Sequence, residues 1–157
     1  MLEHIGLDYP ANNGPRLLFA DHHEKIEKAC DALRAATYGE DSLELIARYR
    51  AFERAMLEHM AAEEEQILPA YAAEAPDEAA EIRATHDELR RQLYGLGVEV
   101  ELHCVRAESL EQIVKTLRAH AAREDARMYP WAQVHLPLRT KEELVTRIAR
   151  SLRSLAP

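Results

Sequence analysis

Residues 59–64 read His-Met-Ala-Ala-Glu-Glu, and they are the first of two related stretches that decide the fold. The second, His-Ala-Ala-Arg-Glu-Asp at residues 120–125, follows sixty-one positions later. Each stretch places a glutamate four residues after a histidine, and each is followed by a proline, Pro69 or Pro130. Side chains four residues apart share one face of a helix, about 6 Å apart along its axis. Each copy therefore predicts a nitrogen and an oxygen donor side by side, a spacing that suits a metal ion.

The two histidine–glutamate pairs continue apolar stripes instead of lying opposite them. Leu45, Tyr49, Phe52 and Met56 precede His59 and Glu63 in steps of three or four, and Leu110, Ile113 and Leu117 precede His120 and Glu124 in the same way. This spacing is typical of a helix face that turns toward a core. An unpaired carboxylate is costly in a core, so it must be neutralised, paired or coordinated. A metal ion would resolve that cost for both residues of a pair.

Length and composition favour one helical domain spanning residues 1–157. The chain has 157 residues, 5 of them Gly, and a formal net charge of −8. It shows no basic stripe and no long uncharged run, so we expect neither nucleic acid nor a membrane as a partner. The N-terminus has neither a basic nor an apolar signal region, and two cysteines form no disulfide framework. These features favour a cytoplasmic location.

The apolar periodicity predicts four long helices and a shorter fifth. We expect the first two at about residues 15–37 and 41–75. The third follows a short turn at Pro76-Asp77 and continues to about Val100. The fourth runs over about 109–130 (an extension to residue 133 is left open), and the fifth over about 140–155. Either Asp41 or Ser42 is predicted to cap the second helix, and Glu44 completes a capping box with Asp41. Pro69 is predicted to kink that helix or end its regular part. Short links between long helices predict an all-α, antiparallel up-down-up-down four-helix bundle over about residues 15–133, with a short extra C-terminal helix. The sequence leaves open whether that last helix docks along the bundle or on another subunit.

The repeat extends to the first and third helices. Aligning Phe19 with Ile82 places His23 on His86, each followed by an apolar residue three positions later. His22 competes with His23, because the helical stripe tolerates either, and the match to the third helix favours His23. Each half of the chain thus supplies one lone histidine and one histidine–glutamate pair. The six predicted metal ligands are His23, His59, Glu63, His86, His120 and Glu124.

Two halves with two histidines and one glutamate each fit two metal ions better than one. Glu63 and Glu124 would each place one oxygen on each metal, with the imidazoles on the outer sides. Mixed nitrogen and oxygen donors suit iron, manganese or zinc.

The order of these residues, with a proline after each paired motif, resembles the hemerythrin-like (HHE cation-binding) domain family over roughly residues 15–133. The resemblance implies an antiparallel four-helix bundle around two Fe ions joined by an oxo or hydroxo bridge. It also implies binding of O2 or a related small molecule such as NO or peroxide, in sensing, storage, or the response to iron and redox stress. A metal-binding or sensing protein is favoured over an enzyme, and a homodimer is left open.

The chain departs from the oxygen carriers of this family at two positions. The carriers have a second histidine one turn after the third-helix histidine, where this chain has Arg90, and they place the last carboxylate where it has Asp125. The Glu124 spacing matches the bacterial branch instead. The missing histidine favours a redox-active or sensing site over pure O2 storage.

Several residues near the motifs have plainer interpretations. Glu64, Glu65 and Asp125 fall off the stripes and are interpreted as solvated, with orientation of a ligating imidazole as the alternative. Tyr71 and Tyr129 are near enough to contact the site, but a structural role is favoured. Cys30 is interpreted as a buried, inert thiol.

Three other functions compete with the leading hypothesis. A ferritin-like di-iron oxidase or iron-handling enzyme would use a Glu-x-x-His motif, which is absent in phase with the stripes. A hydrolase using zinc would show His-Glu-x-x-His, which is also absent. A metal-free helical interaction module would tolerate Leu or Met at all six positions.

Overall fold

The computed structural model describes residues 15–153 and residue 155, with side chains described from residue 21 onward. The elements are α1 (Pro15–Thr37), α2 (Ser42–Gln66), α3 (Leu68–Glu74), α4 (Pro76–Glu101), α5 (Ala107–Arg123), η1 (Glu124–Met128), α6 (Tyr129–His135) and α7 (Leu138–Arg153). Because no strand occurs in this part of the chain, the prediction of an all-helical structure is confirmed. Most of the predicted irregular lead-in, and the side chain of Phe19, lie outside the described residues.

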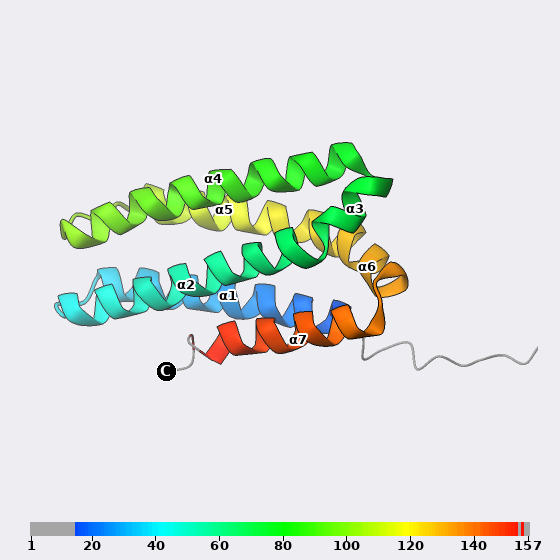
Figure 1. Cartoon of the computed structure of the whole chain (residues 1–157). Coiled ribbons are helices and arrows are strands. Elements are labelled where there is room, and N and C mark those ends of the chain that lie inside the picture. Colours follow the sequence, from blue (N-terminus) through cyan, green and yellow to red (C-terminus); the bar gives the residue numbers. More distant parts are fainter. Residues whose placement is uncertain (1–14, 154, 156–157) are drawn as a thin grey trace, which may run out of the picture.

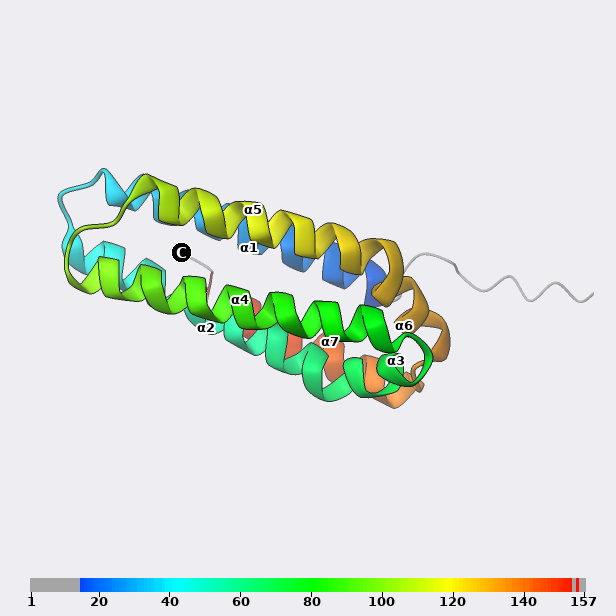
Figure 2. The same ribbon diagram turned by 90° about the horizontal axis from the view of Figure 1, so that it is seen from above.

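Four long helices lie lengthwise beside one another. The chain reverses direction between α1 and α2 and between α4 and α5, and α2 and α4 also run in opposite directions (Figure 1). Helix α1 packs against α2 and α5, and α4 packs against the same two helices. Seen from above, α5 covers α1 and α4 covers α2 (Figure 2). Every long helix therefore directs one face toward a shared interior.

The second helix begins where the sequence predicts, but it ends before the predicted residue 75. The side chain of Asp41 accepts hydrogen bonds from the backbone N–H groups of Leu43 (3.0 Å) and Glu44 (3.1 Å). Such a cap satisfies donors that the first helical turn leaves unpaired. The regular helix ends at Gln66, and α3 starts anew with Pro69 in its first turn. Pro69 thus ends the regular part of the predicted 41–75 helix.

The region around Pro130 differs from its prediction. Regular α-helix ends at Arg123, and η1 is a five-residue π-helical turn that leads into α6. Pro130 has no N–H group and cannot donate to the carbonyl four residues back. In the turn before it, the N–H group of Tyr129 donates to the carbonyl of Glu124, five residues back. Helical structure therefore continues past Pro130 to His135, and the turn at Glu124–Met128 contains one residue more than an α-helical turn.

The core consists of two apolar layers, and buried histidines and glutamates separate them along the helices. One layer contains Phe52, Met56 and Leu117, and the other contains Ile67, Ile82 and Met128. Each of these six side chains is at most 3 % exposed. The predicted metal ligands thus sit between two water-excluding layers, where an unpaired charge is costly.

Helix α7 runs from Leu138 to Arg153, close to the predicted 140–155, and packs along α1 and α2 (Figure 1). Leu144 and Ile148 are its buried apolar contacts with the second layer. The structure thus docks this helix on its own chain. Among the described residues, no helix is both long enough and apolar enough to cross a membrane.

Candidate metal centre

All six side chains that the sequence predicts as metal ligands meet in the interior. Helix α1 carries one, α2 carries a pair, α4 carries one, α5 carries one, and the last is the first residue of η1. Each is at most 8 % exposed: His23, His59, Glu63, His86, His120 and Glu124. Four α-helices and the start of η1 thus position one buried cluster.

The six residues form two groups of potential ligands, each with its donor atoms within 4.8 Å of one another. The first group is His23, His59, Glu63 and Glu124, and the second is Glu63, His86, His120 and Glu124. Both glutamates belong to both groups, so each carboxylate faces two neighbouring positions. Each group offers two nitrogen and two oxygen donors, a set that suits first-row transition metals.

Several of these donor atoms are close together without being hydrogen-bonded. Oε2 of Glu63 lies 3.2 Å from Nε2 of His86, and Oε1 of Glu124 lies 2.8 Å from Nε2 of His120. Neither carboxylate oxygen makes a hydrogen bond of acceptable geometry, and neither does Nε2 of His59. Buried polar atoms without partners are costly and uncommon. Donor atoms that converge without bonding to one another are what a cation between them would need, so the residues present fit a metal ion.

The electrostatics of the cluster lead to the same conclusion. Burial alone would lower the pKa of His23 and of His86, but the neighbouring carboxylates raise both to about 10. Burial alone would raise the pKa of Glu124, but the imidazoles, His120 first, bring it well below the usual range. Without a metal ion, protons on His23 and His86 thus balance the buried carboxylates. A metal cation would provide the same balance.

Tyr129 reaches the cluster, so of its two interpretations from the sequence, contact with the site describes it better than the favoured structural role. Its side chain is fully buried, and its hydroxyl lies 3.1 Å from Oε2 of Glu124, against Oε1 of Glu63, and 3.3 Å from Nε2 of His23. The π-helical turn explains this position, because it stacks residue 129 directly on residue 124. Burial, and then the two carboxylates, raise the pKa of Tyr129 well above its usual value, so its hydroxyl is protonated when no cation is present.

Glu64 orients one of the predicted ligands. Its Oε1 lies 2.8 Å from Nδ1 of His86, and its Oε2 accepts a hydrogen bond of 2.8 Å from Nη2 of Arg90. The interpretation of Glu64 as solvated is therefore wrong, and the alternative of an orienting carboxylate describes it. Glu65 is exposed and pairs with Arg147. Asp125 combines both interpretations. Its side chain is 40 % exposed, and its Oδ1 lies 3.5 Å from Nδ1 of His23.

His22 is buried beside the cluster but belongs to neither group of ligand atoms. Its ring stacks on that of His59, with centroids 4.4 Å apart, and its Nε2 lies 3.4 Å from Oγ of Ser151 on α7. Burial, and then His59 and His23, strongly lower the pKa of His22, so it is neutral. His23, the residue favoured from the sequence, contributes to the first group instead.

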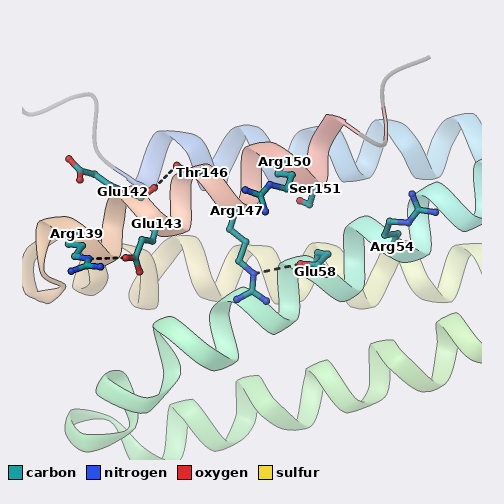
Figure 3. Close-up of a pocket in the computed structure, with 9 residues that line it drawn as sticks. All are labelled: Arg54, Glu58, Arg139, Glu142, Glu143, Thr146, Arg147, Arg150 and Ser151. Carbon is teal, nitrogen blue, oxygen red and sulfur yellow. Dashed lines mark hydrogen bonds and ion pairs between the residues drawn. The ribbon is translucent and has the colours of Figure 1, made fainter.

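A surface hollow of about 770 Å³ lies between α2 and α7, and Ser151 is part of its wall (Figure 3). Charged side chains make up most of the lining: Arg54, Glu58, Arg139, Glu142, Glu143, Arg147 and Arg150, with Thr146 and Ser151. Arg147 lies 3.6 Å from Glu58, and Arg139 lies 3.0 Å from Glu143. The hollow is separate from the metal-ligand cluster, although Ser151 contacts both the hollow and His22.

An all-helical chain with a buried histidine and glutamate cluster of this kind belongs to the metal-binding helical proteins. More particularly, the sequence matches the Hemerythrin HHE cation binding domain over residues 16–132, most of its length, and the chain belongs to that family. No curated protein and no solved structure matches the chain. Membership of the family, together with the buried cluster, indicates that the protein binds a cation.

Proposed function

We propose that this protein is a hemerythrin-like di-iron protein that binds O2 or a related small molecule such as NO or peroxide. The observation that carries the proposal is the sharing of Glu63 and Glu124 between two groups of donor atoms. A single metal ion would occupy only one of the two groups and would leave the two histidines of the other group without a cation. Two ions, one in each group, would use the histidines of both groups.

Each of the six residues has a distinct role in this proposal. His23 and His59 would hold one ion, His86 and His120 the other, and the two glutamates would link them. Iron would supply reversible electron transfer and an open position for a diatomic ligand; manganese or zinc would fit the same donors. The apolar layers on either side of the cluster would exclude bulk water from it.

The same family membership supports a proposal for the domain organisation and the cellular role of the protein. We propose a single domain over residues 1–157 in which α1, α2, α4 and the run α5–α6 form the four-helix bundle of the family, at about residues 15–133. Sensing, storage or a response to iron and redox stress in the cytoplasm is the proposed setting, and binding is proposed rather than catalysis. Arg90 supports a redox or sensing role, since it stands where the oxygen carriers have a further histidine.

The direct test is elemental analysis of protein purified without added metal and without chelators, with an ultraviolet–visible spectrum of the same sample in air. We expect about two irons per chain and the charge-transfer bands of a di-iron centre. The variants Glu63→Ala and Glu124→Ala should each lower the metal content with little loss of helix. Glu65→Ala is the matched control, because Glu65 is an exposed glutamate that pairs with Arg147, away from the cluster.

Other results of the metal analysis would indicate a different function. A chain that holds no transition metal and whose fold is indifferent to chelators would be a metal-free interaction module. Multiple turnovers of ferrous iron or of an organic substrate in air would indicate a ferritin-like enzyme. If the metal content stayed unchanged in both glutamate variants, the linking role of these residues would be wrong.

A further inference from the structure

The hydroxyl group of Tyr129 is placed asymmetrically in the cluster. Three polar atoms lie close to it: Nε2 of His23, Oε2 of Glu124 and Oε1 of Glu63. All three residues belong to the first group of donors, and His23 belongs to that group alone. The phenol oxygen thus lies on the side of the cluster that His23 occupies. The two candidate metal positions therefore differ in their surroundings.

A hydrogen bond alone does not explain this arrangement. A phenol has one proton, so it can donate to only one of two carboxylates. In the metal-free protein the second carboxylate depends on the imidazole of His23, whose Nε2 lies 3.3 Å from Oε2 of Glu124, and it still faces a phenol oxygen that offers it no proton. Two acceptor oxygens that face each other in a buried site are unfavourable. A cation between the phenol oxygen, the two carboxylates and His23 would convert this repulsion into shared coordination.

We propose that Tyr129 is a fifth protein ligand to the metal ion in the first group, with its phenolate oxygen bound beside His23, His59, Glu63 and Glu124. The inference rests on the proposed function, since it requires the metal-loaded protein. Binding breaks the O–H bond and forms a metal–oxygen bond, and the proton is released to solvent with those that the other ligands lose. No change in the oxidation state of the metal is needed.

The consequence is an unequal pair of metal positions. The ion in the first group has two nitrogen and three oxygen ligands from the protein, whereas the ion in the second group has two of each. An additional small ligand would therefore bind the ion on the His86–His120 side, which has one protein ligand fewer. The π-helical turn is the backbone feature responsible, because an uninterrupted α-helix would place Met128, not Tyr129, on the face that carries Glu124.

The test is a visible and resonance Raman spectrum of the full-length protein loaded with ferric iron. We expect a broad visible phenolate-to-iron band and enhanced ring vibrations of a coordinated tyrosine. The variant Tyr129→Phe should lose both signals and should release one of its two irons to a competing chelator more readily than the other. Tyr71→Phe is the control, because Tyr71 is equally an internal tyrosine but packs on Trp131, outside the cluster.

The outcomes separate this inference from the proposed function. A wild-type protein that binds two irons without any tyrosine signal would overturn the inference alone and leave the hydroxyl as a hydrogen-bond donor. Identical spectra and iron release in Tyr129→Phe and Tyr71→Phe would overturn it in the same way. A wild-type protein that binds no iron would instead overturn the proposed function. The wild-type spectrum is informative even if Tyr129→Phe does not fold.

Discussion

Nδ1 of His86, on α4, lies 2.8 Å from Oε1 of Glu64, on α2. With a proton on Nδ1, the imidazole presents the lone pair of Nε2 to the cluster, which is the tautomer that a metal ligand needs. Arg90 holds the other carboxylate oxygen at 2.8 Å. Arg90 therefore holds in place the carboxylate that orients His86.

This relationship predicts that Glu64→Ala weakens metal binding without removing any ligand. Loss of the carboxylate that orients a ligating histidine typically costs about 10–100-fold in metal affinity. We expect a decrease of that size in a chelator competition, with unchanged maximal stoichiometry and helix content. Glu65→Ala, on the adjacent exposed residue, should bind metal like the wild type. Equal affinities in the two variants would show that the contact between Glu64 and His86 has no role in holding metal.

The two adjacent histidines of α1 should respond differently to substitution. His23 contributes a donor atom to the first group, whereas His22 stacks on His59 and contacts Ser151. We expect His23→Ala to lose at least part of its metal and His22→Ala to keep about two ions per chain. Elemental analysis of both variants, purified side by side, is the measurement. Loss of metal from His22→Ala with retention in His23→Ala would reverse the assignment and make His22 the ligand.

The sequence predicted those features of the site that depend on one helix at a time. His59 and Glu63 lie four residues apart within α2, and Glu124 follows His120 by four residues at the point where α5 passes into η1, so periodicity alone identified both pairs. The first helix, Pro15–Thr37, also has the predicted bounds. Local spacing is sufficient in these cases because no long-range contact changes the helical period.

Local spacing could not predict the features that depend on packing between helices or on a change of helical period. The contact between Glu64 and His86 requires the register of α2 against α4, which no local pattern encodes. Tyr129 enters the cluster because one extra residue is inserted before it, whereas the regular period placed Met128 on that face. The contact between Ser151 and His22 requires α7 to dock on its own chain, an alternative that the sequence left open.

The two cysteines should differ sharply in reactivity. Cys30 is 1 % exposed, whereas Cys104 is exposed. Burial raises the pKa of the Cys30 thiol to about 11, and the reactive species is the thiolate. At pH 8 only about one Cys30 thiol in a thousand would be ionised even if a reagent could reach it. A disulfide reagent at pH 8 should therefore titrate one thiol in the folded protein and two in denaturant. Rapid titration of two thiols in the folded state would contradict the inert role of Cys30.

The two glycines of α4 give an internal test of the packing. A Cβ atom added at Gly97 would lie 2.5 Å from the hydroxyl oxygen of Tyr49, whereas nothing lies within 4 Å of one added at Gly95. The Tyr49 ring cannot simply move aside, because its side chain is buried and its hydroxyl lies 2.7 Å from the carbonyl oxygen of Leu93. Replacement by alanine should therefore change the stability of the protein in opposite directions at Gly95 and Gly97, which lie about half a helical turn apart.

We expect Gly95→Ala to stabilise the protein by up to about 1 kcal/mol, the difference in helix propensity between the two residues. Gly97→Ala gains the same propensity but forces the Tyr49 ring out of place, for a net loss of about 1–3 kcal/mol. Denaturant unfolding of the two variants beside the wild type measures both changes. Adding Tyr49→Leu to Gly97→Ala should recover part of the loss, because the group in the way is then absent. Equal stabilities for the two alanine variants would mean that α2 and α4 are not in the contact that the structure gives them.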